Sequence, residues 1–296
     1  MIGRIAGAAI ISAAIIVTVA PVFAGVDVSA DGRSVSIRID GSSYKLQGRL
    51  YRPDVDGQRP LVVVAHGTCG ERCRRRPQGA EKYFDAMARV FARSGYVVYV
   101  FNRIGYAESD GYLAQPYRTH ESHGGCNTQD YETAGRLVAD QIGPVAEELV
   151  KASFVDPGRV VVMGHSGGGL GAIALTKDRP SWLKGVISVA GARGGVCADG
   201  EYTGGHFYNQ HMIVAYHNYG LKGRTPVLML YAENDPRTVR AESWRDAYVG
   251  AGGTAKLVIL PRQPRSGHSV KRWHPADWIP PASRFLEGLG LPPLER

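Results

Sequence analysis

The sequence has few of the features that mark fibrous, repetitive or disordered proteins. Its 38 Gly and 17 Pro in 296 residues follow no three-residue period, which excludes a collagen-like fibre. No internal repeat or low-complexity segment occurs, which argues against a solenoid or a propeller. Charged residues make up only 21% of the chain and apolar residues 44%, so the composition is that of a folded globular protein.

Acidic residues are fewer than basic ones, with 27 Asp and Glu against 35 Lys and Arg. The arginines are scattered, and the dense basic run is Arg72 to Arg76, which contains a cysteine. No basic helix, zinc-finger spacing or aromatic RNA-binding motif accompanies this run, so we expect no nucleic-acid partner. The run is consistent with a solvated loop or, alternatively, with a clamp for a carboxylate or phosphate of a substrate.

Long apolar runs are also scarce, and the one present is N-terminal. Residues 1–24 combine Arg4, an uncharged run from Ile5 to Ala20, and Pro21 shortly before Ala24, which is the pattern of a cleaved export signal. An uncleaved anchor is the alternative, because the run nearly reaches the length of a membrane span. We expect residues 25–296 to be a single periplasmic or secreted domain without stable membrane association after cleavage. The sequence leaves the oligomeric state open.

The four cysteines are Cys69, Cys73, Cys126 and Cys197. Outside the cytoplasm an even number of cysteines suggests disulfides, and four cysteines allow three pairings. Proximity in the sequence favours Cys69 with Cys73 and Cys126 with Cys197. The spacings do not match a zinc site, so we expect no metal.

Short apolar runs alternate with stretches of helical spacing along the rest of the chain. The predicted strands are 34–39, 44–51, 61–65, 96–101, 160–163, 186–189, 227–231 and 257–260. The predicted helices are 80–94, 131–151 with a kink at Pro144, 168–176, 238–249 and 282–289. This alternation predicts an α/β fold with a mostly parallel sheet of about eight strands, helices on both faces and an antiparallel opening pair. Residues 192–223 are expected to form an irregular, aromatic-rich, cap-like insertion.

The segment Gly164-His165-Ser166-Gly167-Gly168 has the Gly-x-Ser-x-Gly spacing of a nucleophile elbow, between an apolar strand and a helix. The turn is so tight that side chains two residues on either side of the serine would collide. A serine needs a base to take its proton, and the base needs an acid to orient it. Asp235 and His268 each follow a predicted strand, in the order that this elbow requires, so both should lie at the same sheet edge as Ser166. Glu233 is the alternative acid and His274 the alternative base.

With these motifs, residues 35–290 resemble the α/β-hydrolase superfamily, and within it the dienelactone-hydrolase-like and acyl-esterase-like members. The most specific segments are the elbow, Glu233-Asn234-Asp235-Pro236, Gly267-His268, and an early strand that ends at His66-Gly67. The resemblance implies that Ser166 is the nucleophile, His268 the base and Asp235 the acid. It also implies an oxyanion hole formed by the Gly167 backbone N–H and by one N–H of the loop after His66, where Thr68 and Gly67 are both candidates.

Residues 102–109 resemble a further segment of that superfamily, Arg-x-Gly-x-Gly-x-Ser, with Ala107 where glycine is common. Arg103 and Tyr106 from this segment are candidates to contact the substrate. Tyr208, from the aromatic-rich stretch, is a third candidate if that stretch shapes a pocket; ordinary packing on the sheet is the alternative.

We therefore expect a serine hydrolase that cleaves small carboxylic esters through an acyl-enzyme and needs no cofactor. A serine peptidase of the same fold, acting on short peptides, is one alternative. A non-catalytic binding protein on a hydrolase scaffold is another, although a complete set of nucleophile, base and acid argues against it.

Alkylation of the exported protein without a reductant tests the disulfide prediction. Because a sulfur in a disulfide does not react with iodoacetamide, we expect mass spectrometry to find the four cysteines unmodified until the protein is reduced and unfolded. Four alkylated cysteines in the untreated protein would refute the prediction.

Overall fold

The structure, a computed structural model, describes residues 26–68, 79–111, 130–193 and 206–295. Several predicted features lie outside these ranges and stay predictions: the export signal, the Arg72 to Arg76 run, and the cysteines Cys69, Cys73, Cys126 and Cys197.

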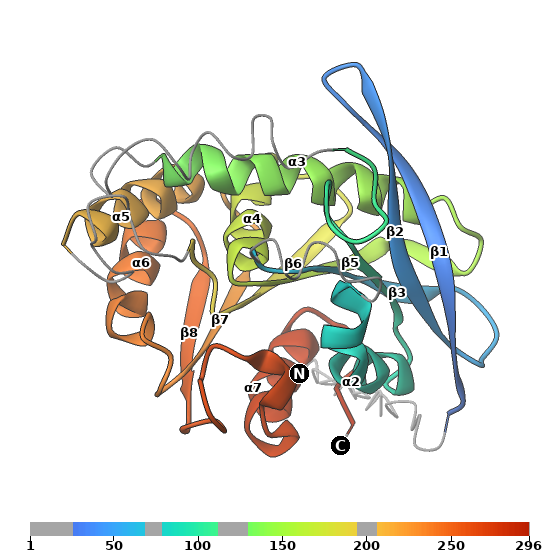
Figure 1. Cartoon of the computed structure of the whole chain (residues 1–296). Helices are drawn as coiled ribbons and strands as arrows, with labels where there is room; N and C mark the ends of the chain where they lie inside the picture. The colour runs from blue at the N-terminus through green and yellow to red at the C-terminus, as the bar shows by residue number, and fades with distance from the viewer. Residues whose placement is uncertain (1–25, 69–78, 112–129, 194–205, 296) are drawn as a thin grey trace, which may run out of the picture.

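An eight-stranded sheet lies at the centre of the fold (Figure 1). Its strands are β1 (Val28–Ile39), β2 (Ser42–Pro53), β3 (Arg59–Ala65), β4 (Val97–Phe101), β5 (Val155–His165), β6 (Leu183–Val189), β7 (Val227–Ala232) and β8 (Ala255–Leu260). The order across the sheet is β1-β2-β4-β3-β5-β6-β7-β8. The pairs β1–β2 and β2–β4 are antiparallel and the other pairs are parallel. The predicted α/β sheet and its antiparallel opening pair are confirmed.

Helices cover both faces of this sheet. They are α2 (Ala80–Arg93), α3 (Tyr131–Leu149), α4 (Gly167–Leu175), α5 (His206–Gly220), α6 (Thr238–Gly250) and α7 (Pro275–Gly288), with a short 3₁₀ helix at Val270–Arg272. The helices α3, α4, α5 and α6 share one hydrophobic core with the sheet, and α2 and α7 share a second core on the opposite face (Figure 1).

The central strands are continuous aliphatic runs because both of their faces are covered. In β3 the residues from Leu61 to Ala65 are completely buried. Leu61, Val63 and Ala65 belong to one core, while Val62 and Val64 belong to the other. Because successive side chains of a strand point to opposite faces, the same strand packs against both helical layers.

Two predictions about helices were wrong, and both errors have a physical cause. Residues 206–220 form the regular helix α5, because its buried side chains recur at helical spacing: Tyr208, Met212, Ala215, Tyr216 and Tyr219. The last helix begins at Pro275 and not at Ala282. Proline is well suited to a first helical turn, and this helix continues through Pro280 and Pro281. The helix α3 likewise continues past Pro144 to Leu149.

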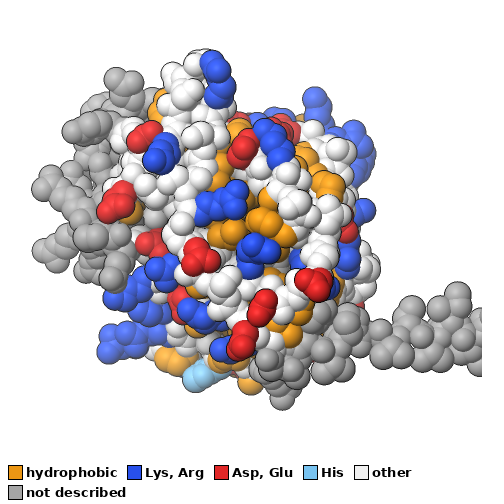
Figure 2. All heavy atoms as spheres, turned by 90° about the vertical axis from the view of Figure 1, so that its right-hand side faces the viewer, with side chains coloured by type: hydrophobic (Ala, Val, Ile, Leu, Met, Phe, Trp, Pro, Cys, Tyr) orange, Lys and Arg blue, Asp and Glu red, His pale blue; other side chains and the backbone are white. Residues whose placement is uncertain are grey.

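On the face beside β1 and β2, Lys and Arg side chains are interspersed with Asp and Glu (Figure 2). The positive net charge is therefore not gathered into one basic patch on this face. No helix within the described ranges is both long enough and apolar enough to cross a membrane.

Candidate functional site

Ser166 lies in a strained turn between β5 and α4. Its backbone φ is 53°, a left-handed conformation that a residue with a side chain rarely adopts. The turn has no space beside it: a Cβ on Gly164 would lie 2.1 Å from the Gly168 carbonyl oxygen, and a Cβ on Gly168 would lie 2.2 Å from the Ala65 carbonyl oxygen. The turn therefore requires glycine at both positions, as the sequence predicts.

Strand pairing places the end of β3 beside this turn. Ala65 is opposite Gly164, and Gly164 is opposite Ser188 of β6. The Ser166 N–H donates to the Val189 carbonyl at 2.9 Å, and the Ser166 carbonyl accepts from Leu170 of α4 at 3.0 Å. The serine is thus fixed to the carboxyl edge of the sheet and to the N-terminus of α4, where the helix dipole favours negative charge.

The loop after β3 lies directly against the serine. A Cβ on Gly67 would be 2.8 Å from the Ser166 Cβ, and the Thr68 backbone nitrogen is 3.5 Å from the Cβ position of Gly167. The three oxyanion candidates Gly67, Thr68 and Gly167 are therefore neighbours around the serine.

Three side chains from separate loops form one line of hydrogen bonds. The Nδ1 atom of His268 lies 2.7 Å from Oδ2 of Asp235, and its Nε2 atom lies 3.1 Å from Oγ of Ser166. Asp235 is completely buried, whereas about a quarter of the His268 side chain is exposed. These distances allow a proton to pass from the serine to the imidazole while the carboxylate holds the ring.

The protonation states follow from the surroundings of Asp235. Burial alone raises the pKa of this carboxyl, but its hydrogen bond to His268, the His268 charge and the Arg237 guanidinium outweigh burial, so the pKa lies below its ordinary value. The second carboxylate oxygen accepts from the Arg237 backbone N–H at 3.0 Å and from its Nη1 at 3.3 Å. An ionised carboxylate only accepts hydrogen bonds, so Nδ1 of His268 carries the proton and Nε2 is free to act as a base.

Hydrogen bonds outside this line hold the histidine loop in place. The Nε2 atom of the buried His165 lies 2.8 Å from the His268 carbonyl oxygen. The Trp273 indole N–H donates to the Gly267 carbonyl at 2.8 Å. Asn234, next to the acid, bonds both the backbone N–H and the carbonyl of Gln263, at 2.9 Å each. The acid loop and the histidine loop are therefore linked to each other and to the elbow.

The structure also separates the predicted residues from their alternatives. Glu233 is exposed, and its backbone N–H is bonded to the Leu260 carbonyl. His274 is exposed at the start of α7, and its backbone N–H donates to Gln263 Oε1. The acid and the imidazole that approach Ser166 are those of Asp235 and His268.

The three residues predicted to contact substrate are largely buried. Arg103 is 5% exposed and donates to the Gly67 carbonyl at 3.0 Å, with the Tyr106 hydroxyl 3.5 Å from the same Nη2 atom. Tyr208 is 1% exposed and donates its hydroxyl hydrogen bond to the Arg193 carbonyl, so it belongs to the core beneath the site. The role of these residues toward a substrate stays a prediction.

Arg193 was not predicted as part of the site, whereas His66 and His165 belong to the predicted strand end at His66-Gly67 and to the predicted elbow. Arg193 follows β6 and donates to the Thr68 hydroxyl, and burial together with the nearby Arg103 lowers its pKa to about 10. Position in the sequence was the available signal: His66 directly follows β3, His165 ends β5, and Arg193 lies in the loop that follows β6.

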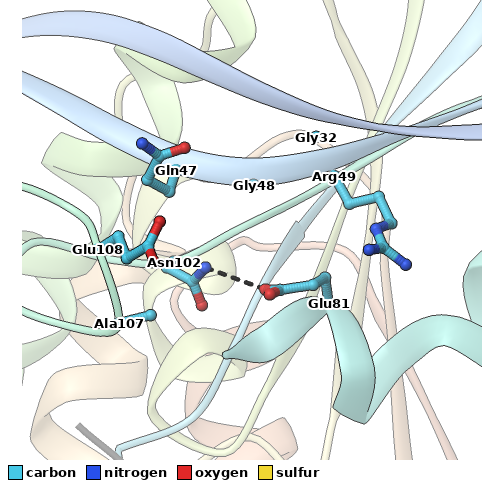
Figure 3. A pocket seen from close by; sticks show the side chains of 8 residues that line it. All are labelled: Gly32, Gln47, Gly48, Arg49, Glu81, Asn102, Ala107 and Glu108. Atoms are coloured by element: carbon cyan, nitrogen blue, oxygen red, sulfur yellow. Dashed lines mark hydrogen bonds between the residues drawn. The ribbon is translucent and has the colours of Figure 1, made fainter. Parts of the chain in front are cut away.

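A separate cavity of about 150 Å³ lies on the β2 side of the loop that follows β4 (Figure 3). Its lining includes Glu81, Asn102, Ala107 and Glu108, but neither Ser166 nor Arg103. Ala107 has a left-handed φ of 49°, a conformation that glycine adopts more readily than alanine. In the residues that the structure describes, no three His, Cys, Asp or Glu side chains come together as a metal site.

Comparison with known proteins gives a family and several relatives. The model of the prolyl oligopeptidase family matches residues 82–287. "Putative esterase NocK" of Nocardia uniformis subsp. tsuyamanensis is 27% identical over 210 residues, which is 71% of this chain and 50% of that protein. The quorum-quenching protein AidA of Acinetobacter baumannii (strain MDR-ZJ06) is 30% identical over 154 residues, which is 52% of this chain and 42% of AidA. The match thus spans half or less of each relative.

Solved structures agree on the fold. The dienelactone hydrolase-like promiscuous phosphotriesterase P91, from metagenomic libraries, superimposes with a TM-score of 0.54 over 90% of both chains at 16% sequence identity. This similarity confirms the expected α/β-hydrolase fold.

The buried His165 predicts how stability depends on pH. Burial lowers its pKa from 6.5 to about 3, with His268 adding to the effect. As pH falls below about 6.5, the unfolded chain binds a proton that the native His165 does not, so stability is lost between those two pKa values. One such proton changes the free energy of unfolding by about 1.4 kcal/mol per pH unit. Between about pH 5.5 and about pH 4, we expect the free energy of unfolding of His165→Gln to fall less steeply with falling pH than that of the wild type, with slopes that differ by this amount.

Urea unfolding at a series of pH values measures these slopes. Exposed His274→Gln is the matched control, and its slope should equal that of the wild type. A His165→Gln slope equal to that of the wild type would contradict the assignment of a buried, neutral His165.

Proposed function

The chain belongs to the prolyl oligopeptidase family. We propose that it is a serine hydrolase that cleaves carboxylic esters through an acyl-enzyme. The observation that carries the proposal is the line of hydrogen bonds from Ser166 through His268 to the buried Asp235. The name of the relative NocK supports an ester substrate.

In the proposed first step, Ser166 Oγ attacks the ester carbonyl carbon while its proton passes to His268 Nε2. Asp235 stabilises the imidazolium that forms, because it accepts from Nδ1 and remains ionised. The negative charge that develops on the carbonyl oxygen is stabilised by the Gly167 N–H at the start of α4 and by one N–H of the loop after β3. Each such donor contributes about 3 kcal/mol to stabilising the transition state.

The tetrahedral intermediate then collapses. The bond to the alcohol oxygen breaks, His268 gives its proton to that oxygen, and the acyl group stays on Ser166. In the second half of the reaction water attacks the acyl carbon, His268 takes a proton from the water, and the acid leaves as Ser166 Oγ recovers a proton. Neither half requires a cofactor.

A peptidase that acts on short peptides is the second candidate, and the family match favours keeping it. The same three side chains perform amide and ester hydrolysis by the same steps, and the two substrates differ in the leaving group that His268 must protonate. The ratio of ester to amide turnover therefore distinguishes the candidates.

The esterase proposal is tested with p-nitrophenyl acetate, p-nitrophenyl butyrate and amino-acid p-nitroanilides. We expect ester hydrolysis by the wild type and a loss of about 10⁴-fold or more in kcat for Ser166→Ala, because the nucleophile is removed. Ser243→Ala, which changes a serine hydroxyl bonded to the Arg240 carbonyl in α6, is the control and should keep full activity. Anilide turnover equal to ester turnover would favour the peptidase, and ester turnover unchanged in Ser166→Ala would refute both.

We also propose that the protein works outside the cytoplasm, on the basis of the apolar run and the small residues that end at Ala24. Intact-mass measurement of the periplasmic or secreted fraction should find a chain that begins at Gly25. A full-length chain that starts at Met1 and sediments with membranes would contradict cleavage and favour the anchor.

A further inference from the structure

The Gly67 N–H and the Thr68 N–H, in the two peptide units after β3, both lie near Ser166. The directions of the two carbonyl groups show which N–H can face the reacting carbonyl oxygen. The His66 carbonyl oxygen would lie 2.6 Å from a Cβ on Gly168, so it faces the first turn of α4. The described residues contain no cis peptide bond, and in a trans peptide the C=O and the following N–H point in opposite directions. The Gly67 N–H therefore points away from the elbow.

The next peptide unit has the opposite orientation. The Gly67 carbonyl oxygen receives hydrogen bonds from His66 Nδ1 at 2.7 Å and from Arg103 Nη2 at 3.0 Å. The Thr68 N–H of the same unit points away from these donors, and its nitrogen is 3.5 Å from the Cβ position of Gly167. Within the described part of the chain, no protein acceptor takes this N–H.

The two donors to the Gly67 carbonyl support each other. The Arg103 backbone N–H donates to His66 Nε2 at 3.0 Å, so the His66 proton lies on Nδ1, where it can bond the Gly67 oxygen. Burial, with the Arg103 charge, lowers the pKa of His66 well below its usual value, which favours the neutral ring.

Arg103 is itself held from two elements. Its neighbour Asn102 donates its backbone N–H to the Gln47 carbonyl of β2 at 2.7 Å. The Asn102 side chain accepts from the Ala80 N–H at 2.7 Å, in the first turn of α2. It also donates to Glu81 Oε2 of the same turn at 3.0 Å (Figure 3). The main chain before Arg103 is thus fixed, and its guanidinium packs 5.1 Å from the centre of the Tyr106 ring.

We infer that the Thr68 backbone N–H is the second donor of the oxyanion hole and that Arg103, acting with His66, is a positioning residue that keeps this N–H directed at the reacting carbonyl oxygen. The inference rests on the proposed ester hydrolysis at Ser166. Arg103 does not touch the substrate in this account. It acts by fixing the Gly67 carbonyl, and this fixes the Thr68 N–H at the other end of the same peptide unit. A dipole that is already oriented stabilises a transition state better than one that must reorient.

Arg103→Met tests this role because methionine keeps much of the side-chain volume and removes the donor. On neutral p-nitrophenyl acetate and on the anionic mono-p-nitrophenyl ester of glutaric acid, we expect kcat to fall about 100-fold with KM within about threefold of the wild type. Arg103→Lys, which retains a donor, should recover kcat to within about tenfold of the wild type. The control is Arg52→Met, whose guanidinium lies 4.0 Å over the Phe154 ring, and its kcat should change by less than about twofold.

Each other result has a definite meaning. Unchanged kcat in Arg103→Met overturns the inference while leaving the proposed function intact. A rise of KM confined to the anionic ester, with kcat retained, assigns Arg103 to substrate binding and also overturns the inference. Absence of ester hydrolysis by the wild type overturns the proposed function instead.

A measurement on the wild type avoids dependence on a variant that fails to fold. The protein is labelled with ¹⁵N-threonine and titrated with a boronic acid, which forms a tetrahedral adduct on a nucleophilic serine. The Thr68 amide, assigned by its loss in Thr68→Ser, should shift to higher proton frequency as it bonds the adduct oxygen. A Thr68 amide that does not shift when the adduct forms would overturn the inference.

Discussion

The left-handed turn at Ser166 is the constraint on which the rest of the site depends. A serine at a φ of 53° is held there because glycines at 164 and 168 let β5, α4 and the end of β3 approach to distances that any side chain would forbid. The same close approach places the loop after β3 against the serine. One tight turn thus positions both the nucleophile and the N–H groups that are proposed to stabilise charge beside it.

The remaining parts of the site are rigid because their polar groups are bonded outside the line of proton transfer. His165 bonds the backbone of His268, Trp273 bonds that of Gly267, and Asn234 links the acid loop to the histidine loop. The Arg237 guanidinium and backbone N–H hold the second oxygen of Asp235. A buried carboxylate that is bonded at both oxygens stays ionised and fixes the imidazole tautomer, so the chemistry follows from electrostatics built before substrate arrives.

The sequence predicted the sheet, the turn and the three side chains around it because each leaves a local signal. Aliphatic runs mark buried strands, and glycine spacing marks the tight turn. The helix α5 was missed because its tyrosines and histidines have little apolar contrast, although the buried positions do recur at helical spacing. The sequence indicated Arg103 only as a candidate to contact the substrate, and it did not indicate Arg193. The hydrogen bonds from Arg103 to the Gly67 carbonyl and from Arg193 to the Thr68 hydroxyl could not be predicted, because each joins segments that are far apart in the sequence.

The most direct test of the central claim is to find where a fluorophosphonate adds to the protein. Such a probe reacts with a serine whose proton is removed by a neighbouring base, and peptide mass mapping identifies the modified residue. The account predicts a single adduct on Ser166 that forms much more slowly in Asp235→Asn, which disturbs the imidazole tautomer without removing the nucleophile. An adduct on another serine would contradict the assignment of Ser166 as the nucleophile. No adduct on the folded protein would contradict the proposed catalysis and favour a hydrolase scaffold that only binds its ligand.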